Sequence, residues 1–239
     1  MISFIIPTLN EEKIIEKTIS CISILNDKHE IIISDGGSLD KTLEIAKKYN
    51  CKISKHEEKE KQTIAGGRNN GAKIAEGDYL AFIDADCFIY DSNSFFKKAL
   101  NIFEKDKNIV ALTVSIKVLP EFEKLSDKVI FRCLNSLYFI LNNILHIGGA
   151  SGEFQMIKND EFKKVKGFDE NLVTGEDHDL FRRLAKIGKT KFVSDLTIYH
   201  TGRRAHKIGW AKLLSLWTIN SISTIFLKKS SSKVWEEIR

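Results

Sequence analysis

The sequence predicts an α/β fold in which helices flank a mostly parallel central sheet. Short β-branched runs alternate with helical stretches through the first half of the chain, and this rhythm is typical of βαβ units. At 239 residues the chain is long enough for one such domain with a substantial core. The expected strands are 2–6, 30–34, 52–54 and 79–83, and the expected helices are 11–25, 41–49 and 64–76.

The second half of the chain has a less regular pattern. We expect a helix over 94–104, a strand over 109–118 and a long apolar helix over 129–147. This last segment carries Arg132 and Asn142, which are costly inside hydrocarbon, so it is not a clean membrane span. Two alternatives remain for it, an amphipathic helix at a membrane surface or groove and an ordinary core-packing helix.

The end of the chain predicts another amphipathic helix over 210–227. Two tryptophans beside the basic pair Lys228-Lys229 favour docking at a membrane interface, and a plain packing helix is the alternative. We therefore divide the chain into a main α/β domain over 1–205 and a C-terminal amphipathic helical extension over 206–239. The apolar positions of the expected helix are Trp210, Leu213, Leu214, Trp217 and Ile225.

The composition indicates which kinds of partner and which cellular compartment suit the protein. A net charge of +5 suits anionic ligands such as phosphates or an acidic membrane surface, and it does not call for a nucleic-acid partner. The four cysteines form no C-x-x-C pair, which argues for free thiols and against a zinc site. The N-terminus has no basic region and too short an apolar run for a signal peptide, so we expect a cytoplasmic protein, with the amphipathic segments as a peripheral membrane contact.

Polar clusters follow three of the expected strands. In parallel sheets, ligands bind at the carboxyl ends of the strands, so these loops should meet in one crevice. The clusters are Pro7-Thr8-Leu9-Asn10-Glu11, Asp35-Gly36-Gly37-Ser38-Leu39-Asp40 and Asp84-Ala85-Asp86.

Two of these clusters, and a separate glycine-rich run over 65–71, carry residue types suited to a nucleotide and a cation. Asp84 and Asp86 can hold Mg²⁺ or Mn²⁺ beside a diphosphate, although such a triplet also occurs in solvated turns. The Asp35 loop offers a carboxylate that can accept from a base N–H or a ribose hydroxyl; an Asx turn with Ser38 as N-cap is compatible with that role. The run 65–71 offers Arg68 and exposed backbone amides for phosphate or base contacts, or is simply a glycine-rich loop before a helix.

Together with Gly67-Arg68-Asn69 and Gly175-Glu176-Asp177, these motifs resemble the inverting family 2 glycosyltransferases in order and spacing through about residue 205. The resemblance implies the GT-A nucleotide-diphospho-sugar transferase fold, whose mostly parallel sheet is Rossmann-like. It also implies a divalent cation, Mn²⁺ or Mg²⁺, held by Asp86 and Asp84 with His200 as a further ligand. The nucleotide-sugar contacts that it implies are Pro7, Thr8, Asn10, Glu11, Asp35, Gly37, Ser38, Arg68, Asp84, Ala85 and Asp86.

The resemblance extends to the sugar and acceptor side. The run 148–154 is similar to the family's glycine-rich segment, which brings Gly152 and Glu153 to the donor sugar and acceptor, and Glu176 joins them. The run 166–170 resembles the family's G-G-F-D-E with lysine at the first glycine. Arg203 and Arg204 would neutralise a diphosphate or an acceptor phosphate, with a solvated basic turn as the alternative.

Asp177 is the candidate catalytic residue. A glycine precedes the helical pattern that begins beside it, and a helix N-terminus favours the ionised carboxylate. The resemblance makes Asp177 the general base that takes the proton from an acceptor hydroxyl, and plain helix capping by Glu176 or Asp177 is the alternative. The other histidines, His178 and His206 among them, are expected at the surface or in supporting positions.

The expected function is therefore nonprocessive inverting transfer of a sugar from a UDP- or GDP-sugar to an acceptor hydroxyl on a lipid-linked or cell-surface saccharide. The Q-x-x-R-W motif of processive synthases is absent from the sequence. A polyprenyl-phosphate acceptor is an alternative, but a phosphate nucleophile is already ionised and needs no base. A catalytically inactive module for nucleotide binding or membrane recruitment is a further alternative, whereas an oxidoreductase is disfavoured because no G-x-G-x-x-G follows the first strand.

Overall fold

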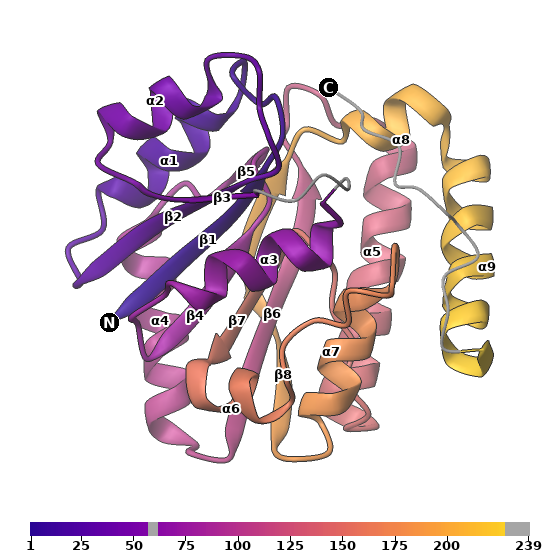
Figure 1. Cartoon of the computed structure of the whole chain (residues 1–239). Coiled ribbons are helices and arrows are strands. Elements are labelled where there is room, and N and C mark those ends of the chain that lie inside the picture. Colours follow the sequence, from indigo (N-terminus) through magenta and orange to yellow (C-terminus); the bar gives the residue numbers. More distant parts are fainter. Residues whose placement is uncertain (57–61, 228–239) are drawn as a thin grey trace.

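The computed structural model describes residues 1–56 and 62–227, with side chains described through residue 220, and confirms the predicted α/β fold (Figure 1). In the first half, each expected strand and helix is present. The strands are β1 (Ile2–Thr8), β2 (His29–Asp35), β3 (Lys52–Lys55) and β4 (Tyr79–Ile83), and the helices are α1 (Ile15–Ser23), α2 (Thr42–Lys48) and α3 (Ile64–Lys73).

The second half adds strands to the same sheet and covers it with further helices. Its elements are β5 (Cys87–Phe88), α4 (Ser92–Lys105), β6 (Ile109–Val118), α5 (Leu125–Phe139) with the π-helical turn η1 (Ile140–Ile144), β7 (Phe154–Lys158), α6 (Asn159–Lys164), α7 (Glu176–Leu184), β8 (Lys189–His200), α8 (Arg203–Ile208) and α9 (Trp210–Leu227).

The described strands form one sheet in the order β3-β2-β1-β4-β7-β6-β8-β5. Within this sheet, β7 and β5 run against the other strands. The antiparallel register of β4 and β7 pairs Ile83 with Phe154, so the loop that enters β7 lies beside the loop that leaves β4. The carboxyl ends of the six parallel strands and the amino end of β7 therefore share one edge of the sheet.

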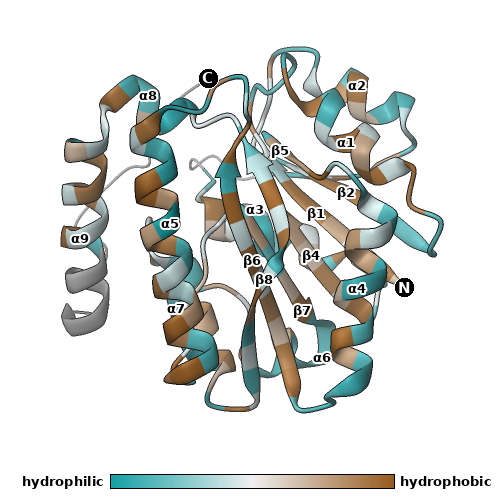
Figure 2. Cartoon of the chain, turned by 180° about the vertical axis from the view of Figure 1, so that it is seen from behind, coloured by the Kyte–Doolittle hydropathy of each residue, from teal (hydrophilic) through white to brown (hydrophobic). Residues whose placement is uncertain are grey.

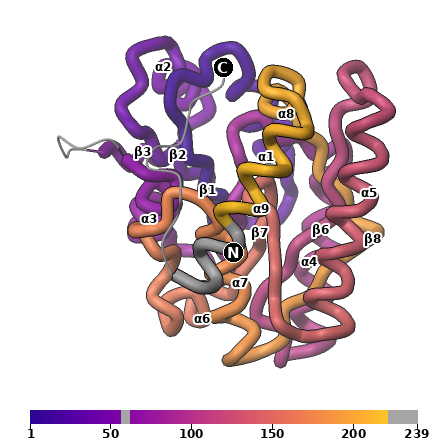
Figure 3. Tube along the Cα trace, turned by 90° about the vertical axis from the view of Figure 1, so that its right-hand side faces the viewer, coloured from indigo at the N-terminus to yellow at the C-terminus, as the bar shows by residue number. Residues whose placement is uncertain are grey.

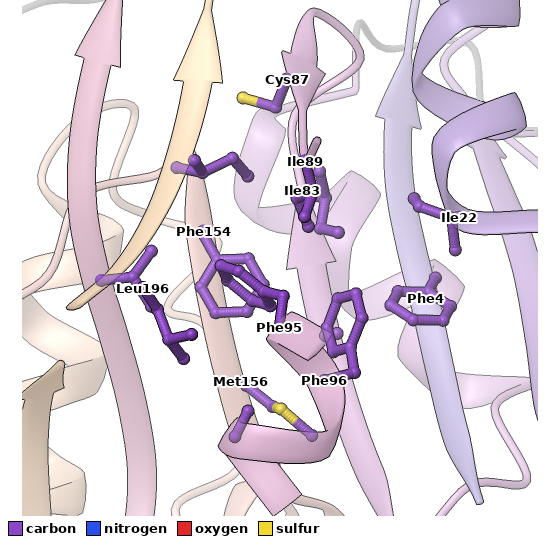
Figure 4. Packing of buried hydrophobic residues seen from close by; sticks show 14 of the residues in the cluster. Phe4, Ile22, Ile83, Cys87, Ile89, Phe95, Phe96, Phe154, Met156 and Leu196 are labelled. Carbon is purple, nitrogen blue, oxygen red and sulfur yellow. The ribbon is translucent and has the colours of Figure 1, made fainter. Parts of the chain in front are cut away.

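Side chains along β1 point alternately to the two faces of the sheet, and each face has its own hydrophobic core. Phe4 and Ile6 point to the face covered by α1, α2, α4 and α5, where Phe4 meets Phe96 edge to face at 4.8 Å between ring centroids (Figure 4). Ile5 points to the opposite face, which α3, α6 and α7 cover. Figure 1 shows these three helices in front of the sheet, and Figure 2 shows α4 on the other side. Both faces of the sheet are thus buried, as expected of a parallel α/β sheet.

The glycines of α3 let this helix lie close against the sheet. A Cβ on Gly71 would stand 2.5 Å from the Ile5 side chain and 3.3 Å from that of Ser34. The sequence had suggested exposed backbone amides in this run; instead, Gly66 and Gly67 are buried within the helix. Close packing against the sheet therefore accounts for Gly71.

Gly71→Ala should therefore overpack the interface between α3 and the sheet. We expect a loss of roughly 1–3 kcal/mol in the free energy of unfolding, measured by urea denaturation. Asn70→Ala on the same helix is the control, because Asn70 is only partly buried and its side chain bonds to Lys73. Equal stability of the two variants would contradict the close-packing role of Gly71.

The C-terminal helices are attached to α5 through one buried carboxylate. Asp127 is fully buried and accepts hydrogen bonds from Trp210 Nε1 at 2.6 Å, with His206 Nε2 at 2.7 Å. Figure 1 shows α9 outermost on the side of α5, and Figure 3, which views that side, shows α9 nearest the viewer. The proposed division after residue 205 falls inside α8, and Lys228-Lys229 lies outside the described residues.

Within the described ranges, none of the helices combines the length and the apolar character needed to cross a bilayer. Docking of the C-terminal extension on a membrane surface stays a prediction.

Candidate active site

The shared edge of the sheet opens into a cavity of about 650 Å³. Fourteen of the eighteen candidate binding, catalytic and metal residues line it. They come from the end of β1 and the loop after it, α3, the loop after β4, the loop before β7, the start of α7, the end of β8 and the start of α8. They are Pro7, Thr8, Glu11, Arg68, Asp84, Ala85, Asp86, Gly152, Glu153, Glu176, Asp177, His200, Arg203 and Arg204.

Four of the expected nucleotide-binding residues do not line the cavity and lie in the loops behind its lining. They are Asn10, Asp35, Gly37 and Ser38. Asp35 is buried and accepts hydrogen bonds from the backbone N–H groups of Gly37 and Ser38, both at 3.0 Å, which is the Asx turn expected from the sequence. The expected N-cap role of Ser38 is wrong, because α2 begins at Thr42 with Lys41 as its N-cap. Gly37 adopts φ +99°, a conformation that favours glycine. This turn presents Gly36, which does line the cavity.

The loops after β1 and β2 are tied to each other. Asn10 N–H donates to Ser38 Oγ at 2.9 Å, and Asn10 Oδ1 accepts from Leu39 N–H at 2.8 Å. The Thr8 hydroxyl lies 3.4 Å from Asp35 Oδ1. These contacts fix the two loops as one unit before any ligand arrives.

Arg68 is the charged centre of the cavity floor. Its side chain is 1% exposed and donates to Glu176 Oε1 at 2.7 Å, Asp84 Oδ1 at 3.1 Å and the Gly152 carbonyl at 3.0 Å. Burial alone would lower the pKa of Arg68, but the Asp84 and Glu176 charges outweigh it and raise that pKa, so the guanidinium stays charged. Arg68 thus joins three segments that lie far apart in sequence.

Two carboxyl groups beside Arg68 have raised pKa values. Burial is the main cause for Asp84, whose pKa is raised to about 7 with the help of the Glu153 and Asp86 charges and against the opposing effect of Arg68. Burial and the Asp177 charge raise the pKa of Glu176 to about 8, again against Arg68. The site holds more negative charge than its arginines neutralise, which favours a cationic ligand.

A second arginine closes the opposite side of the cavity. Arg203 donates to both carboxylate oxygens of the buried Glu11 at 2.8 Å, and its Nε lies 3.2 Å from Asp86 Oδ2. The Thr201 hydroxyl donates to the same Asp86 oxygen at 2.5 Å. Arg203 therefore has defined carboxylate partners, unlike a residue of a solvated basic turn.

Asp177 lies in the first turn of α7, as the sequence predicted. Gly175 precedes the helix with φ 80°, and Asp177 Oδ1 accepts from the N–H of His178 at 2.9 Å. A Cβ on Gly152 would approach Asp177 Oδ2 to 3.4 Å and Arg68 Nη2 to 2.7 Å, so glycine leaves room for both groups. Asp177 thus faces the cavity at the level of the Arg68 network.

The residues at the end of β4 fit the divalent cation that the resemblance implies. Among residues 1–56 and 62–220, the side chains form no cluster of three or more His, Cys, Asp or Glu that could hold a metal on their own. That is compatible with Mg²⁺ or Mn²⁺ beside a diphosphate, where waters and phosphate oxygens supply most of the ligands. Asp84 and Asp86 offer oxygen donors, and His200 Nε2 is buried without a hydrogen-bond partner in the described part of the chain.

Several cavity residues were not expected from the sequence. Tyr138 of α5 is buried, and its ring lies 5.7 Å from that of His178. Burial and the Asp177 charge raise the pKa of Tyr138, so its hydroxyl stays protonated. Gln62 lies beside Gly36 and has a buried Nε2 without a partner among the described residues. Only the apolar character of 129–147 hinted at α5, and no signal pointed to Gln62.

Comparison with known proteins identifies the family. The model of glycosyl transferase family 2 matches residues 3–165, which is more than half of the chain. The chain therefore belongs to glycosyl transferase family 2. The match ends before Glu176 and Asp177, so the roles of these two residues rest on geometry.

Two relatives illustrate the range of similarity. An uncharacterized glycosyltransferase of Haemophilus influenzae is 34% identical over 235 residues, covering 89% of this chain and 91% of the relative. A dolichyl N-acetyl-alpha-D-glucosaminyl phosphate 3-beta-D-2,3-diacetamido-2,3-dideoxy-beta-D-glucuronosyltransferase of Methanococcus voltae is 28% identical over 213 residues, covering 78% of this chain and 62% of the relative. The chain spans less than two thirds of the Methanococcus protein and of several other curated relatives.

Solved structures confirm the GT-A fold. The mannosyltransferase PcManGT of Pyrobaculum calidifontis, in complex with GDP-Man and Mn²⁺, aligns with a TM-score of 0.72 and 18% identity over 95% of this chain and 63% of that one. Glucosyl-3-phosphoglycerate synthase of Mycobacterium tuberculosis, in complex with Mn²⁺, UDP and glucosyl-3-phosphoglycerate, aligns with a TM-score of 0.64 and 20% identity over 99% and 81%.

Proposed function

We propose that this protein is a metal-dependent, nonprocessive, inverting glycosyltransferase that moves one sugar from a UDP- or GDP-sugar to an acceptor hydroxyl. The observation that carries the proposal is the single cavity in which the nucleotide-side carboxylates Asp84 and Asp86 meet the candidate base Asp177. Family 2 membership and the nucleotide-sugar complexes of the structural neighbours support it. The acceptor hydroxyl is proposed to belong to a lipid-linked or cell-surface saccharide.

The proposed reaction needs one base and a stabilised leaving group. Asp177 takes the proton of the acceptor hydroxyl as that oxygen attacks the anomeric carbon, opposite the departing diphosphate. Arg68 holds Glu176 and Asp84 in place through its hydrogen bonds at the cavity floor. A divalent cation bound by Asp86 and Asp84, with His200 nearby, would supply positive charge next to the diphosphate. Arg203 and Arg204 line the cavity where they can add to that charge.

A panel of nucleotide-sugars tests this function. With Mn²⁺ present, the correct donor at about a hundredfold its Kd should raise Tm by roughly 5–10 °C. Incubation of that donor with candidate acceptors should then give a product with inverted anomeric configuration by NMR. Retention of configuration, or the absence of any shift with both UDP- and GDP-sugars, would rule the proposal out.

Cation binding should depend on pH because Asp84 must lose its proton to act as a ligand. With the pKa of Asp84 raised to about 7, most of the carboxyl is protonated at pH 6 and most is ionised at pH 8. The affinity for Mn²⁺ should therefore increase roughly tenfold as the pH rises from 6 to 8, measured by the EPR signal of free Mn²⁺.

Asp84→Asn is the matched variant for this measurement. It should bind Mn²⁺ more weakly than the wild type at pH 8 and lose most of the pH dependence. An unchanged pH profile in Asp84→Asn would show that another group controls cation binding.

A further inference from the structure

The catalytic cavity continues into an apolar groove between α5 and α9. Leu134, Leu137 and Tyr138 form one wall, and Leu213, Leu214 and Trp217 form the other. Figure 1 shows α9 on the outer side of α5, and the ring of Phe131 on α5 lies 5.4 Å from that of Trp210 on α9. We call this part of the cavity the α5–α9 groove, defined by these six residues.

The chemistry of the α5–α9 groove differs from that of the catalytic end. Every acidic, basic or histidine side chain that lines the cavity comes from other elements, and among the described lining residues α5 and α9 contribute none. Leu137 is 45% exposed, and Trp217 is half-buried. The four leucines of the groove offer no hydrogen-bond partner to a free saccharide, whereas a hydrocarbon chain would remove them from water.

The groove is also continuous with the place where the acceptor must lie. Tyr138 belongs to the groove wall, and its ring contacts that of His178, the residue after Asp177. A molecule whose hydroxyl reaches Asp177 can therefore extend an attached chain along α5.

We propose that the α5–α9 groove binds the hydrocarbon tail of the acceptor, which makes the acceptor substrate an amphiphile: a saccharide head beside Asp177 and an apolar chain between α5 and α9. This inference rests on the proposed function, because it requires that the acceptor hydroxyl binds at Asp177. It assigns the two helices to substrate binding and not only to packing.

A homologous series of n-alkyl β-D-glucosides from hexyl to decyl, used below their micellar concentrations, tests the groove directly with a neutral sugar head. Binding is followed by tryptophan fluorescence, since Trp217 is in the groove wall. Affinity should rise roughly threefold to fourfold for each methylene that the groove takes up. Free glucose is the head-group control and should give no fluorescence change.

Two matched pairs of variants localise the site. Leu214→Glu and Leu137→Glu each place a charge in a groove wall, and each should weaken decyl glucoside binding by roughly tenfold or more. Leu216→Glu on α9 and Val129→Glu on α5 make comparable changes at residues that are 37% and 55% exposed and lie outside the cavity lining. Both controls should bind the probe like the wild type. Circular dichroism should show all four variants folded.

The outcomes separate this inference from the proposed function. Affinity that does not depend on chain length, or equal binding by Leu214→Glu and Leu216→Glu, would overturn the groove assignment. So would a dimer in sedimentation that Leu214→Glu dissociates, because a second copy would then fill the groove. Failure of all nucleotide-sugars in the thermal-shift panel would instead sink the proposed function, while chain-length-dependent binding would still stand.

Discussion

Asp177→Asn should reduce the rate constant of sugar transfer by roughly 10²- to 10⁴-fold, the contribution typical of a positioned general base. Asparagine has nearly the same shape and can still accept the hydrogen bond that Asp177 Oδ1 takes from the His178 N–H. The start of α7 should therefore be preserved. What is lost is the ability to take a proton from the acceptor hydroxyl.

The donor affinity of Asp177→Asn should change by less than about twofold, because the substitution keeps the shape of the side chain and leaves the hydrogen bonds of Arg68 to Glu176 and Asp84 in place. Asp179→Asn is the matched control: the same change two residues later on the same helix, where Asp179 pairs with Arg183 and does not line the cavity. It should retain near wild-type transfer. Equal activity of the two variants would remove Asp177 from the mechanism.

Arg68→Met should cost about 3–5 kcal/mol in the free energy of unfolding at pH 8, the range found when one partner of a buried ion pair is removed. The methionine side chain fills most of the volume but leaves Glu176, 6% exposed, without its cation. Asp84, 28% exposed, loses the same partner. Urea denaturation measures the loss.

The cost should be smaller at pH 6 than at pH 8. The pKa of Asp84, about 7, and that of Glu176, about 8, are above their ordinary values, so the folded state keeps protons that the unfolded state releases. Stability therefore falls as the pH rises from about 4 to 8. Arg68 opposes both shifts, so its removal raises both pKa values further and steepens that fall.

Lys73→Met is the matched control for Arg68→Met. It removes one positive charge from the same helix at an exposed position, where Lys73 Nζ donates to Asn70 Oδ1 at 2.8 Å. Its stability should stay within about 0.5 kcal/mol of the wild type at both pH values. A destabilisation equal to that of Arg68→Met would point to a general charge effect and not to the buried network.

Much of the first half of the fold could be predicted because each element carries its own local pattern. The β-branched runs of β1, β2 and β4 and the polar clusters after them placed three loops at one edge, and the structure has them there. β7 was not predicted, because Phe154–Lys158 is short and shows no alternation of apolar and polar residues that would separate it from its surroundings. Its position depends on pairing with β4, about seventy residues earlier, which no local pattern encodes.

The site could be predicted as a set of residues but not as a set of contacts. Sequence motifs indicated each of these residues separately: Arg68, Asp84, Glu176 and Asp177. The hydrogen bonds of Arg68 to two carboxylates, however, depend on how α3, β4 and α7 converge. For the same reason, Asn10 and Ser38 turned out to hold loops together and not to face the cavity. The walls of the α5–α9 groove could not be predicted, because apolar residues on a helix give the same sequence pattern whether they pack on a core or line a cavity.

The reversed direction of β7 has a consequence for how specificity is encoded. Because β7 runs against β4, the segment entering it reaches the same edge as the donor loops while being supplied by a later stretch of chain. The donor-side loops come from residues 7–86, whereas the helices of the α5–α9 groove and Asp177 come after residue 124. Under the proposed function, donor contacts therefore come mostly from the earlier stretch, with His200, Arg203 and Arg204 added from the later one, and acceptor contacts come from the later stretch. The two stretches are joined by the ion pairs Arg68–Glu176 and Arg203–Glu11. A chimera that exchanges the later stretch between relatives should change the acceptor and keep the donor, provided that those two pairs are retained.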